Sequence, residues 1–140
     1  MSYLKKQKKH SQTYYRKKCV TWAKDDAKKR DNYTCQYCGK TKIQGWQIHG
    51  SHIKPEGSYP SLSADPENII ALCATHHLAG MSRMIGNSKE PSWHGDPLYM
   101  ADWFNKKYPG LKEKLNKKAI ESLKHIINWE QRWNIIKKYK

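Results

Sequence analysis

The stretch "IIALCATHHLAG" (residues 69–80) contains a cysteine followed three and four residues later by two adjacent histidines, Cys73, His76 and His77. A second stretch, "CQYC", places Cys35 and Cys38 three residues apart. In each of the pairs Cys35/Cys38 and Cys73/His76, two residues separate the ligands, so that one short turn can present both to the same ion. The four side chains form a tetrahedral Cys3His set that suits structural Zn²⁺. Two disulfides or two coincidental pairs are the alternatives.

The two neighbouring histidines are expected to serve different sites. We expect the Cys73/His76 pair on the first turn of a helix that runs from about Leu72 to Met81. Successive helical residues are rotated by roughly 100°. If His76 binds the zinc, His77 must face another side of the helix, where it is available to a second, open metal site.

Charge and hydropathy indicate the class of partner. The 140 residues carry a net charge of +15, and the mean hydropathy is −1.00. Residues 1–30 have a net charge of +9 and residues 91–140 of +6, whereas residues 31–90 are neutral. Basic flanks around a neutral centre favour binding to nucleic-acid phosphates; solubility of lysine-rich helices is the alternative. The longest apolar run, "IIALCA", is too short for a membrane span, so we expect a cytoplasmic protein with no membrane partner.

Local patterns predict the organisation of the chain. We expect a basic arm (1–10), a core with its own N-terminal helix (11–90) and a basic helical extension of the same domain (91–140). Within these regions the expected elements are a helix over 11–30, a short strand pair over 43–53, a loop over 54–68, the helix near 72–81, a loop over 84–97, a helix over 98–108 with Asp96 as N-cap, and helical structure over 111–140.

Three stretches resemble a known family. "GSHI" (50–53), "DPENIIALC" (65–73) and the histidine after the last zinc ligand resemble the His–Asn–His signature of HNH nucleases, in particular the zinc-stapled subgroup. The lead-in "KKRDNYTCQYCGK" (28–40) is similar to the same proteins, and "WHGDPLYMADWF" (93–104) more loosely resembles phage-type members. The resemblance implies an α+β fold: a small ββα-metal, treble-clef-like core with a structural zinc, flanked by N- and C-terminal helices.

The resemblance also implies roles for individual residues. His52 matches the general base that takes a proton from the attacking water, Asn68 the residue that braces the loop around it, and His77 the ligand of a catalytic divalent cation such as Mg²⁺ or Mn²⁺. Ser51 stands where the family commonly has Asp or His as a second metal ligand. Its hydroxyl, a water, or another residue can fill that place: His49 shares a face with Ser51 in an extended segment, and His94 is a further candidate.

The leading hypothesis is a metal-dependent DNA endonuclease, phage-like, that nicks or cuts duplex DNA as a monomer or homodimer in a bacterial or phage-infected cell. A non-catalytic zinc-stapled nucleic-acid-binding module and an RNase using the same site are the rivals. The residues expected to contact DNA are basic side chains around the core: Lys17, Lys18, Lys28, Lys29, Arg30, Lys54 and Arg83.

Overall fold

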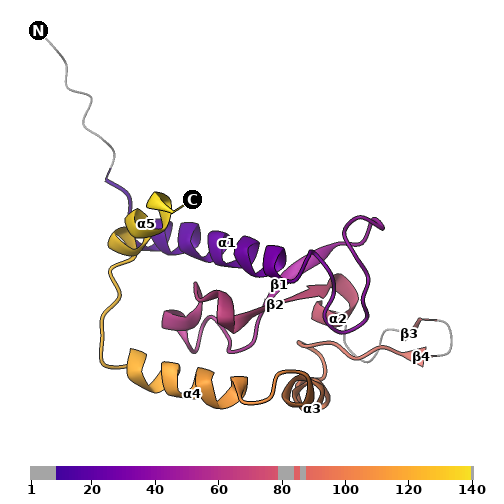
Figure 1. Ribbon diagram of the computed structural model, residues 1–140. Helices are drawn as coiled ribbons and strands as arrows, with labels where there is room; N and C mark the ends of the chain where they lie inside the picture. The colour runs from indigo at the N-terminus through magenta and orange to yellow at the C-terminus, as the bar shows by residue number, and fades with distance from the viewer. Residues whose placement is uncertain (1–8, 79–83, 86–87, 140) are drawn as a thin grey trace, which may run out of the picture.

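A computed structural model describes residues 9–78, 84–85 and 88–139 of the chain (Figure 1). Its helices and strands follow one another as α1 (Gln12–Arg30), β1 (Ile48–His52), the 3₁₀ turns η1 (Pro60–Leu62) and η2 (Pro66–Asn68), β2 (Ile69–Cys73), α2 (Ala74–Leu78), β3 (Met84–Ile85), β4 (Ser88–Lys89), α3 (Pro97–Lys107), α4 (Leu111–Ser122) and α5 (Trp129–Lys138). Among the described residues, no helix is both long and apolar enough to cross a membrane.

A two-stranded hairpin followed by a short helix forms the centre of the molecule. β1 pairs antiparallel with β2, with Ile48 opposite Cys73 and His52 opposite Ile69. Every residue of β2 is buried, as expected for an apolar strand covered on both faces. α2 begins directly after β2. This arrangement, with helices on either side, confirms the α+β fold expected from the sequence.

Two expectations about these elements are wrong. Residues 43–53 contain one strand instead of a pair, because the partner of β1 comes from residues 69–73. The helix expected from Leu72 begins at Ala74, because Leu72 pairs opposite His49 and its fully buried side chain completes the hairpin. The expected end of that helix at Met81 lies outside the described residues.

The helix α1 lies across the hairpin and matches the helix expected over 11–30 (Figure 1). Ser11 caps it by accepting a hydrogen bond from the Tyr14 amide. Small side chains make the buried face, with Cys19, Ala23 and Ala27 all inaccessible to solvent. A Cβ on Gly50 of β1 would lie 2.9 Å from Lys24 Cβ, so this glycine permits the close approach of α1 to β1.

The C-terminal region contains three helices where the sequence predicts two. α3 matches the helix expected over 98–108, and Asp96 occupies its N-cap position as expected, although the Asp96 carboxylate accepts from the Ser92 amide and not from an amide of the helix. The expected helical stretch over 111–140 is divided at 123–128. The second part restarts because Asn128 caps α5 and the Trp129 amide donates to Gln12 Oε1 of α1, 2.7 Å away.

Residues 84–97, expected as loop, contain the short antiparallel strand pair β3–β4. Residues 1–8 of the expected basic arm lie outside the described residues. The division into a core over 11–90 and an extension over 91–140 stays a prediction.

Candidate active site and metal site

Three thiols and one imidazole converge where the loop after α1 meets the β2–α2 junction. The donor atoms of Cys35, Cys38, Cys73 and His76 all lie within 4.8 Å of one another. Cys38 Sγ lies 3.8 Å from Cys73 Sγ, and Cys73 Sγ lies 3.2 Å from His76 Nδ1. A tetrahedral zinc with Zn–S bonds of about 2.3 Å places its sulfurs ~3.8 Å apart. The group can therefore bind zinc.

The surroundings of this group favour metal binding. Hydrogen bonding with Cys73 lowers the pKa of Cys35 to about 3, against the opposing effect of burial, so its thiolate is favoured. His76 Nε2 lies 3.0 Å from Glu90 Oε2. When Nε2 donates its proton to this carboxylate, Nδ1 is left unprotonated toward the thiols. The sequence pattern did not single out Glu90, because it lies 14 positions after His76.

His77 lies outside the Cys3His group. Its Nδ1 is 2.9 Å from Nδ1 of His49 on β1, and its ring centroid is 4.8 Å from that of His94. Burial, followed by the nearby His94 and His49, lowers the pKa of His77 to about 4. Burial also lowers the pKa of His49, with Lys28 and Lys24 contributing. Both imidazoles are therefore neutral near pH 7, which is the form that binds a cation.

Backbone hydrogen bonds bring His94 to this place. The Trp93 amide donates to the His76 carbonyl at 2.7 Å, and the His94 amide donates to the His77 carbonyl at 3.1 Å. The segment before α3 therefore runs beside α2, so His94 lies next to His77 although 16 residues lie between them in the sequence.

His52, at the end of β1, is held by the loop that joins the two strands. Its Nε2 lies 2.7 Å from the carbonyl oxygen of Ser63. A carbonyl only accepts hydrogen bonds, so Nε2 carries the proton and Nδ1 of the neutral ring is an acceptor.

Asn68 joins the two ends of the same loop. Its side chain is inaccessible to solvent; Oδ1 accepts from the Lys54 amide at 2.8 Å, and Nδ2 donates to the carbonyls of Lys54 and Leu62, each at 3.1 Å. Its backbone carbonyl also accepts from the Ile53 amide at 2.7 Å. Every polar atom of the buried amide is used, and these bonds fix the backbone directly after His52 and directly before Ser63.

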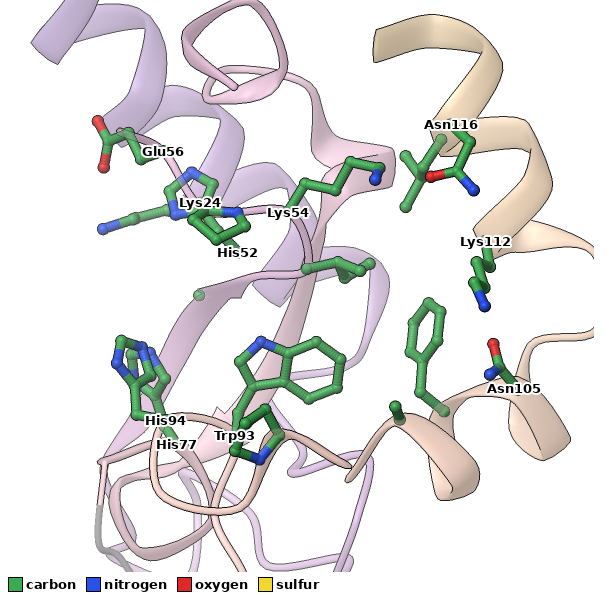
Figure 2. A pocket seen from close by; sticks show the side chains of 17 residues that line it. Lys24, His52, Lys54, Glu56, His77, Trp93, His94, Asn105, Lys112 and Asn116 are labelled. Carbon is green, nitrogen blue, oxygen red and sulfur yellow. The ribbon is translucent and has the colours of Figure 1, made fainter. Parts of the chain in front are cut away.

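His52 and His77 line one end of a single cavity of about 760 Å³ (Figure 2). Lys24 of α1 lines the same end, and the close packing at Gly50 brings it there. The sequence-based set of DNA-contacting residues did not include Lys24. Lys24 lies four residues before Lys28, which puts both on one helix face. This spacing is the sequence signal that could have added Lys24 to the set.

Ser51 is buried on β1, directly before His52. It is inaccessible to solvent, and within the described part of the chain its Oγ is the one buried side-chain polar atom without a hydrogen-bond partner. An orphaned hydroxyl two residues from His49, on the same strand face, fits a cation ligand. The Nδ1 atoms of His49 and His77 and the Oγ of Ser51 therefore suit a divalent cation.

The basic residues expected to contact DNA differ in their environment. Exposed on α1 are Lys17, Lys18 and Lys29, whereas Lys28 pairs with Asp25 at 3.4 Å. Lys54 lies over the Tyr59 ring, 4.6 Å from its centroid. Arg83 lies outside the described residues.

Arg30 is exposed at the end of α1, but its guanidinium is engaged by other protein groups. Its guanidinium binds the Asp31 carboxylate and donates to the carbonyls of Pro66 and Ile69, at 2.8 and 2.7 Å. Asp31 in turn accepts from the Ala71 amide at 2.9 Å. These contacts indicate that Arg30 anchors β2 to the end of α1.

Comparison with known proteins places this site in a family. Residues 35–80 match the family model of the HNH endonucleases, about a third of the chain. No curated protein and no solved structure matches significantly. Residues 35–80 therefore belong to the HNH endonuclease family, with a Cys3His group consistent with its zinc-binding members. Membership implies nuclease activity, which is phosphodiester hydrolysis, on a nucleic acid.

Proposed function

We propose that this protein is a metal-dependent endonuclease that hydrolyses phosphodiester bonds of duplex DNA, with His52 as general base and a divalent cation held at His77. The observation that carries the proposal is that His52 and His77 open into the same cavity, with Lys24 beside them (Figure 2). Base, cation ligand and a positive charge for the phosphate are then available to one scissile bond.

The role of His52 follows from its tautomer. Because Nε2 donates to the Ser63 carbonyl, Nδ1 is the ring nitrogen that takes a proton from an attacking water. Asn68 supports this role indirectly, since its bonds to the Lys54 and Leu62 backbone hold the loop that orients the imidazole. Asn68 is thus a positioning residue.

The cation ligands proposed are His77 and His49, with the Ser51 hydroxyl or a water beside them. Their Nδ1 atoms lie 2.9 Å apart, so both would hold the same cation. When bound, the cation supplies charge stabilisation to the phosphate and to the leaving 3′ oxygen. His94 stands close enough to His77 to take part after a side-chain rotation.

Lysines around the site account for phosphate binding. Lys24 lines the cavity, and the exposed Lys17, Lys18 and Lys29 extend the positive charge along α1. Such contacts position a duplex without reading its sequence. One active site cuts one strand, so a double-strand cut requires a homodimer or two encounters.

A plasmid assay tests the proposal. Zinc-loaded protein is incubated with supercoiled plasmid and Mg²⁺, Mn²⁺, Ni²⁺ or Co²⁺, and the nicked and linear products are quantified on a gel. We expect cleavage by the wild type, and a loss of about 10²–10⁴-fold in H52A with zinc content and DNA binding unchanged. H125A, in an exposed histidine remote from the cavity, is the matched control. No cleavage with any metal would instead support a non-catalytic zinc-stapled binding module.

A further inference from the structure

The cavity extends well beyond the catalytic residues. From His52 and His77 it continues past Trp93 to the space between α3 and α4 (Figure 2). Its volume of about 760 Å³ falls within the range of roughly 300–1,000 Å³ found for pockets that bind small organic groups. Hydrolysis at the catalytic end uses none of the residues at this far end.

The far end combines aromatic surface with a few polar groups. The apolar wall consists of Trp93 and Ile53, which are half-buried, and Phe104, which is almost fully buried. The Trp93 and Phe104 ring centroids are 5.6 Å apart, so Trp93 offers the accessible aromatic surface. Asn105, Asn116 and Lys112 lie at its edge (Figure 2). An aromatic surface stacks against a nucleobase of any sequence, and amide groups can bond to its edge.

The walls of this end are held in place by specific contacts. Leu115 anchors α4 with a fully buried side chain, and Lys118 of the same helix binds Asp65 at 2.8 Å. The Trp93 amide is fixed by its bond to the His76 carbonyl. The far end therefore has two anchored sides.

The charge of the lining favours an anion. Three lysines, Lys24, Lys54 and Lys112, face the cavity against one acidic residue, Glu56. A nucleotide meets both requirements, because its base is apolar on its faces while its phosphate is negative. Its phosphate would lie near His52 and its base beyond Trp93.

We propose that the far end of the cavity binds one unpaired nucleobase of DNA adjacent to the scissile phosphate. The inference rests on the proposed function, since it assumes that the phosphate lies at His52. A base inside a paired duplex must be unstacked before it can enter, whereas a mismatched or bulged base enters at the lowest cost. The protein therefore prefers DNA with an unpaired position over fully paired DNA.

Binding to an inactive variant tests this preference without depending on cleavage. Zinc-loaded H52A is titrated with two duplexes of identical flanking sequence, one fully paired and one with a single bulged 2-aminopurine, at fixed salt. We expect about tenfold tighter binding to the bulged duplex and a change in 2-aminopurine fluorescence on binding. Equal affinities with unchanged fluorescence overturn the proposal.

Two further substitutions in the H52A background assign the preference to the cavity. A101F fills the cavity from α3, and N116L removes an amide at its edge. Each should reduce the ratio of bulged-duplex to paired-duplex affinity to within about twofold of unity, while the affinity for the paired duplex is unchanged. N134L, the same change on exposed α5 outside the cavity, should keep the full preference. If A101F and N116L both retain zinc and the preference persists, the cavity is not the base site.

The outcome is distinguishable from that of the catalytic proposal. If the wild type cleaves no DNA with any metal but the preference and its loss in A101F and N116L are observed, the base site stands and the catalytic assignment fails. If the wild type cleaves DNA and binding shows no preference, the catalytic proposal stands and the base site fails.

Discussion

His76 and His77 are consecutive residues of α2, yet their rings lie in different sites. His76 Nδ1 is 3.2 Å from Cys73 Sγ, and His77 Nδ1 is 2.9 Å from His49 Nδ1. The helical rotation between neighbours sends one imidazole toward the Cys3His group and the other into the cavity.

This division predicts opposite results for two adjacent substitutions. H76A should lose the structural zinc and with it cooperative folding, because four ligands are needed to close a tetrahedral site. H77A should keep one zinc per chain and the wild-type circular dichroism but lose cleavage by 10²-fold or more. Zinc content by elemental analysis and thermal unfolding measure both. Equal loss of zinc in the two variants would contradict the division.

Glu90 should tune the zinc site through His76. E90Q keeps the shape of the side chain but replaces the charged acceptor 3.0 Å from Nε2 with a neutral amide. Loss of such an outer partner typically weakens metal affinity by about 10–100-fold. Competition with a chromophoric zinc chelator measures the change. E113Q, in the first turn of α4 and away from the zinc ligands, is the control; an equal effect there would argue against a specific role of Glu90.

The nitrogen ligands predict a metal preference. Imidazole suits Co²⁺ and Ni²⁺ better than Mg²⁺ and Mn²⁺, which prefer oxygen, so cleavage should be faster with Co²⁺ and Ni²⁺. H49A should weaken Ni²⁺ binding, and H49D should shift the preference toward Mg²⁺. Calorimetric titration of the zinc-loaded variants gives the affinities directly. Unchanged Ni²⁺ affinity in H49A would remove His49 from the ligand set.

Lys24 should bind the phosphate at the catalytic end of the cavity. K24A should lower cleavage by about tenfold and reduce the slope of log affinity against log salt by about one, as expected when one phosphate contact is removed. K29A, an exposed lysine on the same helix that does not line the cavity, should reduce affinity with little change in turnover. The same loss of turnover in both variants would show that only overall charge matters.

Gly50 should resist replacement because of this lysine. In G50A the new Cβ would lie 2.9 Å from both Cβ and Cγ of Lys24, the fixed base of the side chain, so α1 or β1 must move. Overpacking of this kind costs about 1–3 kcal/mol. Chemical denaturation of zinc-loaded protein measures the free energy of unfolding, with G57A, whose Cβ meets nothing within 4 Å, as control. A stability equal to that of G57A would show that the two elements adjust freely.

The zinc group was the part of the site most accessible from sequence. The ligands of each pair lie three residues apart, so local chain geometry brings them together in any fold that forms the two turns. The helix α1 was equally local, and both its ends were predicted within a residue. The boundary between β2 and α2 was misplaced by two residues, because burial of Leu72 in the hairpin overrides its local helical pattern.

The sequence by itself determined the Cys3His set, the basic flanks and the resemblance that names His52, Asn68 and His77. Only the tertiary structure decided which neighbours these residues have. His49 meets His77 across 28 positions and Glu90 meets His76 across 14, while Lys24 reaches the cavity because Gly50 lets α1 approach β1. Sequence spacing fixes the contacts of residues that share one turn. Contacts between distant segments depend instead on how the helices and strands pack against one another.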